Sequence, residues 1–278
     1  MMYIRNELAW NFVSIYYSRN SWHILINELT IIKEKLADEY VDFRISYSEE
    51  KGENIRLAVS SSPADYNRIR ETIEGLNQVI KANPSVSTSS FPYGKTLWKN
   101  HKNNSLLWNP FKIIESGQDF RHFEQTTSIL LLELFDNDYS SDNFLTAGLY
   151  LFLNILKRVK IHGNKIVEVV DKTMESLSEK FENFELQSMI DTLILEYQIE
   201  ENSVFNILDE YWHEVSYSLL FTEWLSSVDI LLGHGFGFEV ISQSILEQLG
   251  LGRSHNMLII ILLCRWNLSR HGELNKTD

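Results

Sequence analysis

Three polar side chains interrupt two apolar segments of the chain, and their types suit the recognition of a polarised carbonyl group. Residues 41–48 alternate so that Arg44 and Ser46 share one face of a strand, and residues 54–60 place Arg56 in the same way. A guanidinium presents its N–H donors as a planar fork that fits a carboxylate or an amide carbonyl. We therefore expect these residues to bind substrate, unless the arginines form structural ion pairs with acidic residues elsewhere in the chain.

A second candidate place follows the predicted last strand, where Tyr93 precedes Gly94 and Lys95. A tyrosine there can donate a proton or a hydrogen bond to substrate, although tyrosines also serve simply to pack. The same region is basic and aromatic, with the residues Lys95, Trp98, Lys99, His101 and Lys102. Such a stretch predicts the binding of an acidic peptide segment, and a solvated surface loop is the simpler alternative.

The last predicted helix ends in the polar residues Arg265, Asn267, Arg270 and His271. Cationic residues in a last helical turn ordinarily interact with the helix dipole, so a catalytic role there is the alternative hypothesis. The histidines are scattered, and the sequence has no CxxC, HExxH or phosphate-loop motif. We therefore expect no metal site and no cofactor.

The elements that must position these residues alternate in the order β-α-β-β-α-β. Helices are predicted to begin at Ser21 and Pro63. The predicted strands cover residues 10–17, 41–48, 54–60 and 86–91. This order is typical of ferredoxin-like domains, in which both helices cover one face of the sheet. Arg44, Ser46 and Arg56 then point to the other face, where they would line a cleft next to a following domain.

From residue 119 onward the apolar spacing is that of helices. The predicted helices cover residues 120–134, 144–159, 166–181, 203–225, 240–249 and 255–269. The glycines between residues 231 and 238 predict a turn. We therefore predict an α+β protein, with a ferredoxin-like sheet domain over residues 1–115 and a mainly helical domain over residues 116–278, either separate or joined in one continuous fold.

Composition and charge exclude several classes of protein. The single cysteine, Cys264, excludes an internal disulfide framework and favours a reducing, cytoplasmic location. No signal peptide is evident, and the longest apolar run, residues 257–264, is too short to span a membrane. Residues 1–115 carry 14 Lys and Arg against 13 Asp and Glu, whereas residues 116–278 carry 11 against 25. An acidic second half argues against nucleic acid as a partner.

Taken together, these segments resemble the C-terminal domain of lantibiotic dehydratases, also called the thiopeptide-type bacteriocin biosynthesis domain. That family opens with a Trp-led strand and continues with a strand pair that reads roughly F-x-R-Y and H-L-R-L-R. It then has a Tyr-Gly-Gly-like stretch and a closing H-M-x-x-N-R helix. The corresponding positions here are Trp10, Ile45-Ser46-Tyr47, Asn54-Ile55-Arg56-Leu57-Ala58, Pro92-Tyr93-Gly94-Lys95 and the segment Leu263 to Leu268. The resemblance covers nearly the whole chain.

The departures from the family pattern narrow the function that the resemblance implies. Family members that eliminate glutamate from glutamylated Ser and Thr use arginines and a histidine. Those positions here are Ser46, Asn54, Ala58 and Leu263, and only Arg56 and Asn267 keep the family residue. A chain that keeps the scaffold without those residues resembles the standalone thiopeptide pyridine synthases. Those enzymes join two dehydroalanines of a precursor peptide in a formal [4+2] aza-cycloaddition, with loss of water and of the leader peptide.

This resemblance implies that an amide must be held as its iminol tautomer by a donor and an acceptor. The candidate catalytic residues are Arg56, Tyr47, Tyr93, His122, Asn267 and His271. Strict alternation places Tyr47 on the core face of its strand, which makes it the weaker candidate. The candidate binding residues are Arg44, Ser46, Lys95, Trp98, Lys99 and Lys102. The expected partners are the ribosomally made precursor peptide and other enzymes of its pathway, with the leader on the basic stretch.

Two other functions are compatible with the same residues. The chain could be a split glutamate eliminase with a diverged site, which would release glutamate from a glutamylated peptide. It could instead be a non-catalytic scaffold that binds the leader peptide and recruits other enzymes. In the second case Arg56 and Asn267 would be dispensable.

Overall fold

The computed structural model describes residues 8–86, 100–109, 117–135, 143–161, 200–213, 218–251, 258–263 and 265–267, and also residues 168, 169, 172, 188, 191, 192 and 195. The chain divides into two compact units. The first comprises Met1–Asn143 with Gln248–Gly250, and the second comprises Phe144–Glu247 with Leu251–Asp278. Each unit is considered by itself below.

The first unit is built on a four-stranded antiparallel sheet. Its strands are β1 (Ala9–Tyr16), β2 (Tyr40–Ser48), β3 (Asn54–Ser61) and β4 (Ser105–Trp108), in the spatial order β2-β3-β1-β4. The prediction of an α+β protein is confirmed, as are the first three strands. Aromatic and β-branched residues dominate these strands, because their side chains pack well on a pleated surface.

The fourth strand lies elsewhere than the sequence predicted. Val86 is 77% exposed and lies outside any strand, residues 87–91 lie outside the described residues, and β4 begins at Ser105. Asn104 explains where the chain returns to the sheet. Its side-chain amide donates to the Ser85 carbonyl at 3.0 Å, and its Oδ1 accepts from the Ser85 N–H at 2.8 Å. This clamp brings the chain back beside β1 after a connection that the periodicity of residues 86–91 did not reveal.

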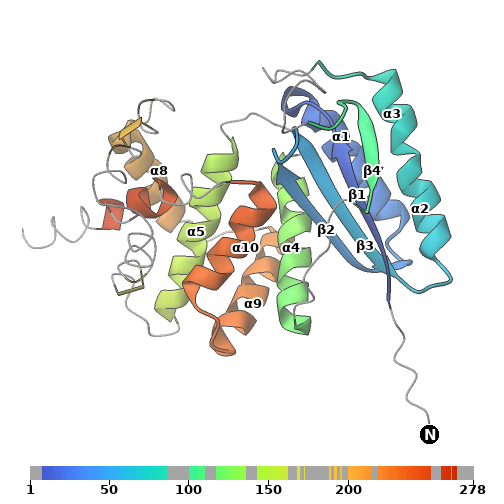
Figure 1. The fold of residues 1–278 in the computed structure, drawn as a ribbon. Coiled ribbons are helices and arrows are strands. Elements are labelled where there is room, and N and C mark those ends of the chain that lie inside the picture. Colours follow the sequence, from blue (N-terminus) through green and yellow to red (C-terminus); the bar gives the residue numbers. More distant parts are fainter. Residues whose placement is uncertain are drawn as a thin grey trace, which may run out of the picture. The chain divides into compact units, whose positions relative to one another are not determined.

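Three helices cover one face of the sheet. They are α1 (Trp22–Lys35), which follows the 3-10 turn η1 (Arg19–Ser21), then α2 (Tyr66–Glu74) and α3 (Leu76–Ala82) (Figure 1). Their apolar stripes bury residues such as Leu25, Leu29, Ile69 and Ile73. The predicted second helix is divided at Gly75, where a Cβ would lie 3.0 Å from the Thr72 carbonyl oxygen. Burial of these stripes supplies the main favourable term for folding the unit.

A fourth helix, α4 (Gln118–Phe135), also belongs to the first unit and lies alongside the edge strand β2 (Figure 1). The Ile45 N–H at the outer edge of β2 donates to Ser128 Oγ at 3.0 Å. An unpaired strand edge is a template for aggregation, and a covering helix is one of the ways in which proteins protect it. Ser128 therefore supplies a hydrogen-bond partner that the sheet itself cannot.

The described part of the second unit is helical. Its helices are α5 (Asn143–Ile161), α8 (Glu201–His213), α9 (Leu219–Gly233) and α10 (Phe238–Leu249), of which Asn143 and the last two residues of α10 belong to the first unit. Residues 258–263 and 265–267 are helical as well. The predicted helix over 166–181 lies almost entirely outside the described residues. Among the helices that the structure describes, none is long and apolar enough to cross a membrane.

The single helix predicted over residues 203–225 is wrong, because two helices occupy that stretch. Ser218 begins α9, and its Oγ accepts the Phe221 N–H at 3.1 Å as an N-cap. The glycine-rich segment ends α9, as the predicted turn requires. Gly235 has φ +85°, and the Phe236 N–H donates back to the Leu231 carbonyl at 3.0 Å, which is a Schellman ending.

Candidate functional site

The face of the sheet opposite α1, α2 and α3 carries polar and aromatic side chains, and we call it the polar face. Strand alternation and the antiparallel register assign residues to it. Its members are Trp10, Phe12, Ser14, Tyr16, Asp42, Arg44, Ser46, Ser48, Asn54, Arg56, Ala58, Ser60, Ser105 and Leu107. Arg44, Ser46 and Arg56 therefore lie on the face opposite these helices, as predicted.

Two of the predicted residues meet at the centre of the polar face. Arg56 on β3 is the register partner of Ser46 on β2 and of Ser14 on β1. Small side chains thus flank the guanidinium on both neighbouring strands. The three side chains form one row across the sheet, with hydroxyl groups on either side of a cation.

Arg56 holds an ion pair that solvent reaches. Its Nη2 lies 2.5 Å from Glu50 Oε2, and the Arg56 and Glu50 side chains are 27% and 66% exposed. Ion pairs of this exposure contribute little net free energy, since water screens them and the long side chains lose freedom. Glu50 can therefore give way to a substrate carbonyl or carboxylate at little cost. Arg56 is the better of the two predicted arginines for that role.

Tyr16 is the residue of the polar face that sequence analysis missed. It is 4% exposed, and burial raises the pKa of its phenol, whereas the charge of Arg56 and a hydrogen bond with Ser14 act to lower that pKa. The phenol is therefore protonated at neutral pH and can act as a hydrogen-bond donor. The alternation of residues 9–16 could have indicated that Tyr16 lies on the polar face, because Tyr16 shares a face of β1 with Ser14. In the structure Tyr16 is the register partner of Asn54.

His101 lies against Tyr16, with the two ring centroids 4.8 Å apart and tilted by 50°. Its backbone N–H donates to the Lys51 carbonyl at 2.7 Å. The neighbouring Lys102 is exposed, and its carbonyl accepts from Ser105 Oγ at 2.5 Å. Of the other residues predicted in this part of the chain, Tyr93, Lys95, Trp98 and Lys99 lie outside the described residues.

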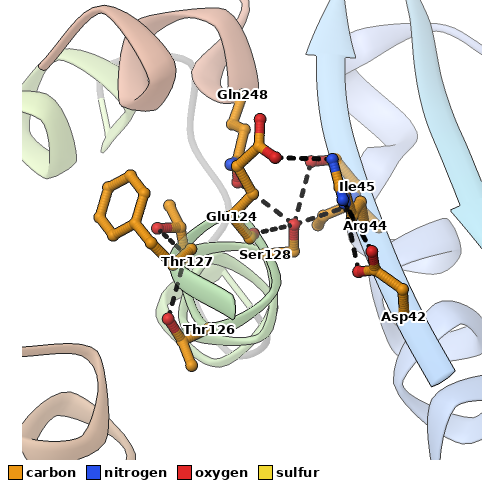
Figure 2. Close-up of polar contacts among 9 residues, drawn as sticks. Asp42, Arg44, Ile45, Glu124, Thr126, Thr127, Ser128 and Gln248 are labelled. Carbon is orange, nitrogen blue, oxygen red and sulfur yellow. Dashed lines mark hydrogen bonds and ion pairs between the residues drawn. The ribbon is translucent and has the colours of Figure 1, made fainter. Parts of the chain in front are cut away.

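Arg44 is held differently from Arg56, by two carboxylates (Figure 2). Its Nη2 lies 2.7 Å from Asp42 Oδ2, and its Nη1 lies 2.6 Å from Glu124 Oε2. The Arg44 and Asp42 side chains are 7% and 6% exposed, and the guanidinium also stands 5.4 Å from the centre of the Trp10 ring. This cluster joins β2 to α4, which matches the structural ion pair that sequence analysis left open. A buried cation with two carboxylates has little capacity left for substrate.

Figure 2 shows that Glu124 and Ser128 of α4 both point toward β2. Ser128 Oγ also lies 3.2 Å from Gln248 Oε1, a residue of the same compact unit. Glu124 and Ser128 are one helical turn apart, so they reach adjacent residues of the strand. This arrangement fixes the wall of the polar face beside Arg44.

Among the remaining predicted residues that the structure describes, none is a member of the polar face. Tyr47 is 1% exposed on the helix-covered face, and its ring is 5.2 Å from that of Trp22. His122 is exposed on α4, and Asn267 is buried within the second unit. His271 lies outside the described residues. The position of Tyr47 agrees with the core packing that its alternation predicted.

Comparison with known proteins identifies solved structures of similar fold. No protein-family model matches the chain, and no curated protein matches it. Among solved structures, the pyridine synthase TbtD from thiomuracin biosynthesis superposes with a TM-score of 0.64 at 13% sequence identity, over 95% of this chain and 99% of that one. The chain shares the fold of TbtD. The structure of TsrL has a TM-score of 0.43 at 10% identity, over 96% of each chain.

Proposed function

We propose that this protein is a thiopeptide-maturation enzyme that forms the central pyridine of its product from two dehydroalanines. The observation that carries the proposal is the match to TbtD, because it extends over nearly the full length of both chains. Strand order β2-β3-β1-β4 supports the further description of the first unit as ferredoxin-like. The residues of the polar face supply donors suited to the chemistry.

The proposed reaction balances without an oxidant or reductant. One dehydroalanine and its preceding amide, in the iminol form, act as a four-atom azadiene, and the second dehydroalanine supplies two carbons. Two carbon–carbon bonds form and close a six-membered ring. The ring then loses water, which takes the iminol hydroxyl and one ring hydrogen. It also loses the leader as a carboxamide, which takes the amide nitrogen and a second ring hydrogen, and the pyridine remains.

Arg56 and the hydroxyls beside it suit the first of these steps. The guanidinium donates to the oxygen of the amide that becomes the iminol, and Ser46 and Ser14 offer neighbouring hydroxyl groups. Tyr16 keeps its proton at neutral pH and contributes a further donor, two residues along β1 from Ser14. Holding both alkenes together supplies a large part of the rate of such a reaction, since a distant encounter becomes an intramolecular one.

The proposed function implies a substrate, partner enzymes and roles for further residues. The substrate is a ribosomally made peptide with a leader, and other enzymes of the pathway must install its dehydroalanines. Two further sets of roles remain predictions. The leader peptide is predicted to bind Lys95, Trp98, Lys99 and Lys102, and catalytic roles are predicted for Tyr93, His122, Asn267 and His271. Arg44 is proposed to shape the wall of the site rather than to bind substrate, because Asp42 and Glu124 already hold it.

Mass spectrometry tests the function directly. A thiazole-containing peptide with two dehydroalanines and an intact leader is incubated with the purified protein. The expected result is a macrocycle lighter by water, together with released leader carboxamide. An unchanged peptide mass, with the leader still bound to the protein, would overturn the proposal and favour a scaffold. Loss of glutamate from a glutamylated peptide would instead identify an eliminase.

A further inference from the structure

One titratable side chain at the end of the polar face has no role in the steps above. His101 packs its ring on Tyr16, and its backbone is tied to the turn between β2 and β3 by the hydrogen bond to the Lys51 carbonyl. Gly52 of the same turn has φ +113° and lies close to both residues, since a Cβ there would stand at the ordinary contact distances of 3.6 Å from Tyr16 Cδ1 and 3.9 Å from the His101 carbonyl oxygen. One ring contact and one backbone hydrogen bond therefore hold His101 at this place.

The surroundings of His101 combine partial exposure with nearby charge. His101 is half-buried, so its imidazole is neither sealed in the core nor fully in solvent. Tyr16 faces it from β1, and both Arg56 of β3 and Glu50 of the turn interact electrostatically with that tyrosine. Lys102 follows it in the sequence, and the carbonyl of Lys51 accepts its backbone N–H. The imidazole thus stands against Tyr16, which lies two residues along β1 from Ser14, the partner of Arg56.

We propose that His101 is a further catalytic residue, the acid–base group for the eliminations that turn the cyclised ring into a pyridine. This inference rests on the proposed function. Neutral imidazole accepts a proton from a ring methylene as the carbon–nitrogen bond to the leader breaks, and the imidazolium returns that proton to the departing amide nitrogen. Histidine suits both halves of this transfer, because its unperturbed pKa lies near neutral pH. Tyr16 acts as a positioning residue that orients the ring.

The test compares His101→Gln with wild type on the leader-bearing didehydroalanine peptide. Glutamine keeps hydrogen-bonding capacity but cannot titrate. The control is His23→Gln, because His23 is exposed on α1, away from the polar face. We expect kcat to fall by about 10²-fold or more for His101→Gln, the range of general acid–base catalysis. The affinity for the peptide should stay unchanged, the cyclised ring still bearing its leader should accumulate, and the acid limb of the pH–rate profile should disappear.

A second measurement does not depend on turnover. The Cε1–H signal of His101, assigned by its loss in His101→Gln, should shift when the peptide binds, whereas that of His23 should not. A wild-type enzyme that forms pyridine, with His101→Gln equally fast and no shift of the His101 signal, would overturn the role of His101 and leave the proposed function intact. A wild-type protein that binds the peptide but leaves its mass unchanged would overturn both.

Discussion

Ser46 and Arg56 are register partners on β2 and β3, so a hydroxyl and a guanidinium lie side by side on the polar face. Their adjacency is imposed by the ladder of backbone hydrogen bonds and by the alternation of the two strands. Arg56 pairs with an exposed carboxylate, whereas Arg44, two residue pairs along the ladder, is buried between two carboxylates. The two arginines should therefore respond very differently to substitution.

Arg56→Ala should abolish most turnover with little loss of stability. Removing one preorganised donor to a developing oxyanion typically costs about 10²- to 10³-fold in rate, and loss of an exposed ion pair costs about 1 kcal/mol or less. Steady-state kinetics on the didehydroalanine peptide and thermal unfolding measure the two effects. The matched control is Arg158→Ala, which removes a guanidinium that is 26% exposed and paired with Asp229. Equal activity of both variants would exclude Arg56 from the site.

Arg44→Met should destabilise the first unit instead. Substitution leaves Asp42 and Glu124 without their cation, and removal of one partner from a buried pair costs about 3–5 kcal/mol. Because the Glu124 side chain is 20% exposed, we expect the lower end of that range. Chemical denaturation measures the loss. Adding Glu124→Gln should recover part of it, since one unpaired carboxylate is then neutralised, and strictly additive effects would contradict the proposed coupling.

Gly250→Ala should destabilise the protein more than Gly235→Ala. Both glycines have positive φ, +67° and +85°, which costs an alanine roughly 1–2 kcal/mol. A Cβ on Gly250 would also lie 2.3 Å from the Tyr47 carbonyl oxygen, while nothing lies within 4 Å of one on Gly235. Comparing the midpoints of thermal unfolding separates the steric part from the conformational part. Equal shifts for both variants would mean that the backbone near Tyr47 moves aside freely.

Tyr16→Phe should make the protein less sensitive to alkaline pH. Burial raises the pKa of Tyr16 above its ordinary value of 10.0 in the folded state. Unfolded chains then release that proton first as pH rises, so the folded state loses stability through and above about pH 10. Phenylalanine removes this contribution while keeping the ring that packs on His101. Denaturation at neutral and alkaline pH tests the point, and an unchanged pH dependence would show that the phenol does not ionise on unfolding.

The first three strands, the stretches that form the covering helices and the face that carries Arg44, Ser46 and Arg56 were predictable from local patterns of residues. Local periodicity is sufficient for this, because side chains of a strand alternate and those of a helix recur every three or four residues. The pairing of Ser46 with Arg56 also follows from two strands joined by a short turn. Core placement of Tyr47 was predictable for the same reason.

Which of these residues come together depends on contacts between segments that are distant in the sequence. β4 begins at Ser105 because Asn104 is clamped to Ser85, a contact between segments that periodicity does not report. Likewise, Arg44 forms its ion pair with Glu124, which lies 80 positions further along the chain. The ring of Tyr16 contacts that of His101, which lies 85 positions further along. Strand and helix patterns are local, whereas ion pairs and ring contacts depend on which distant segments the fold brings together. For that reason the contact of Tyr16 with His101 could be found only in the folded structure.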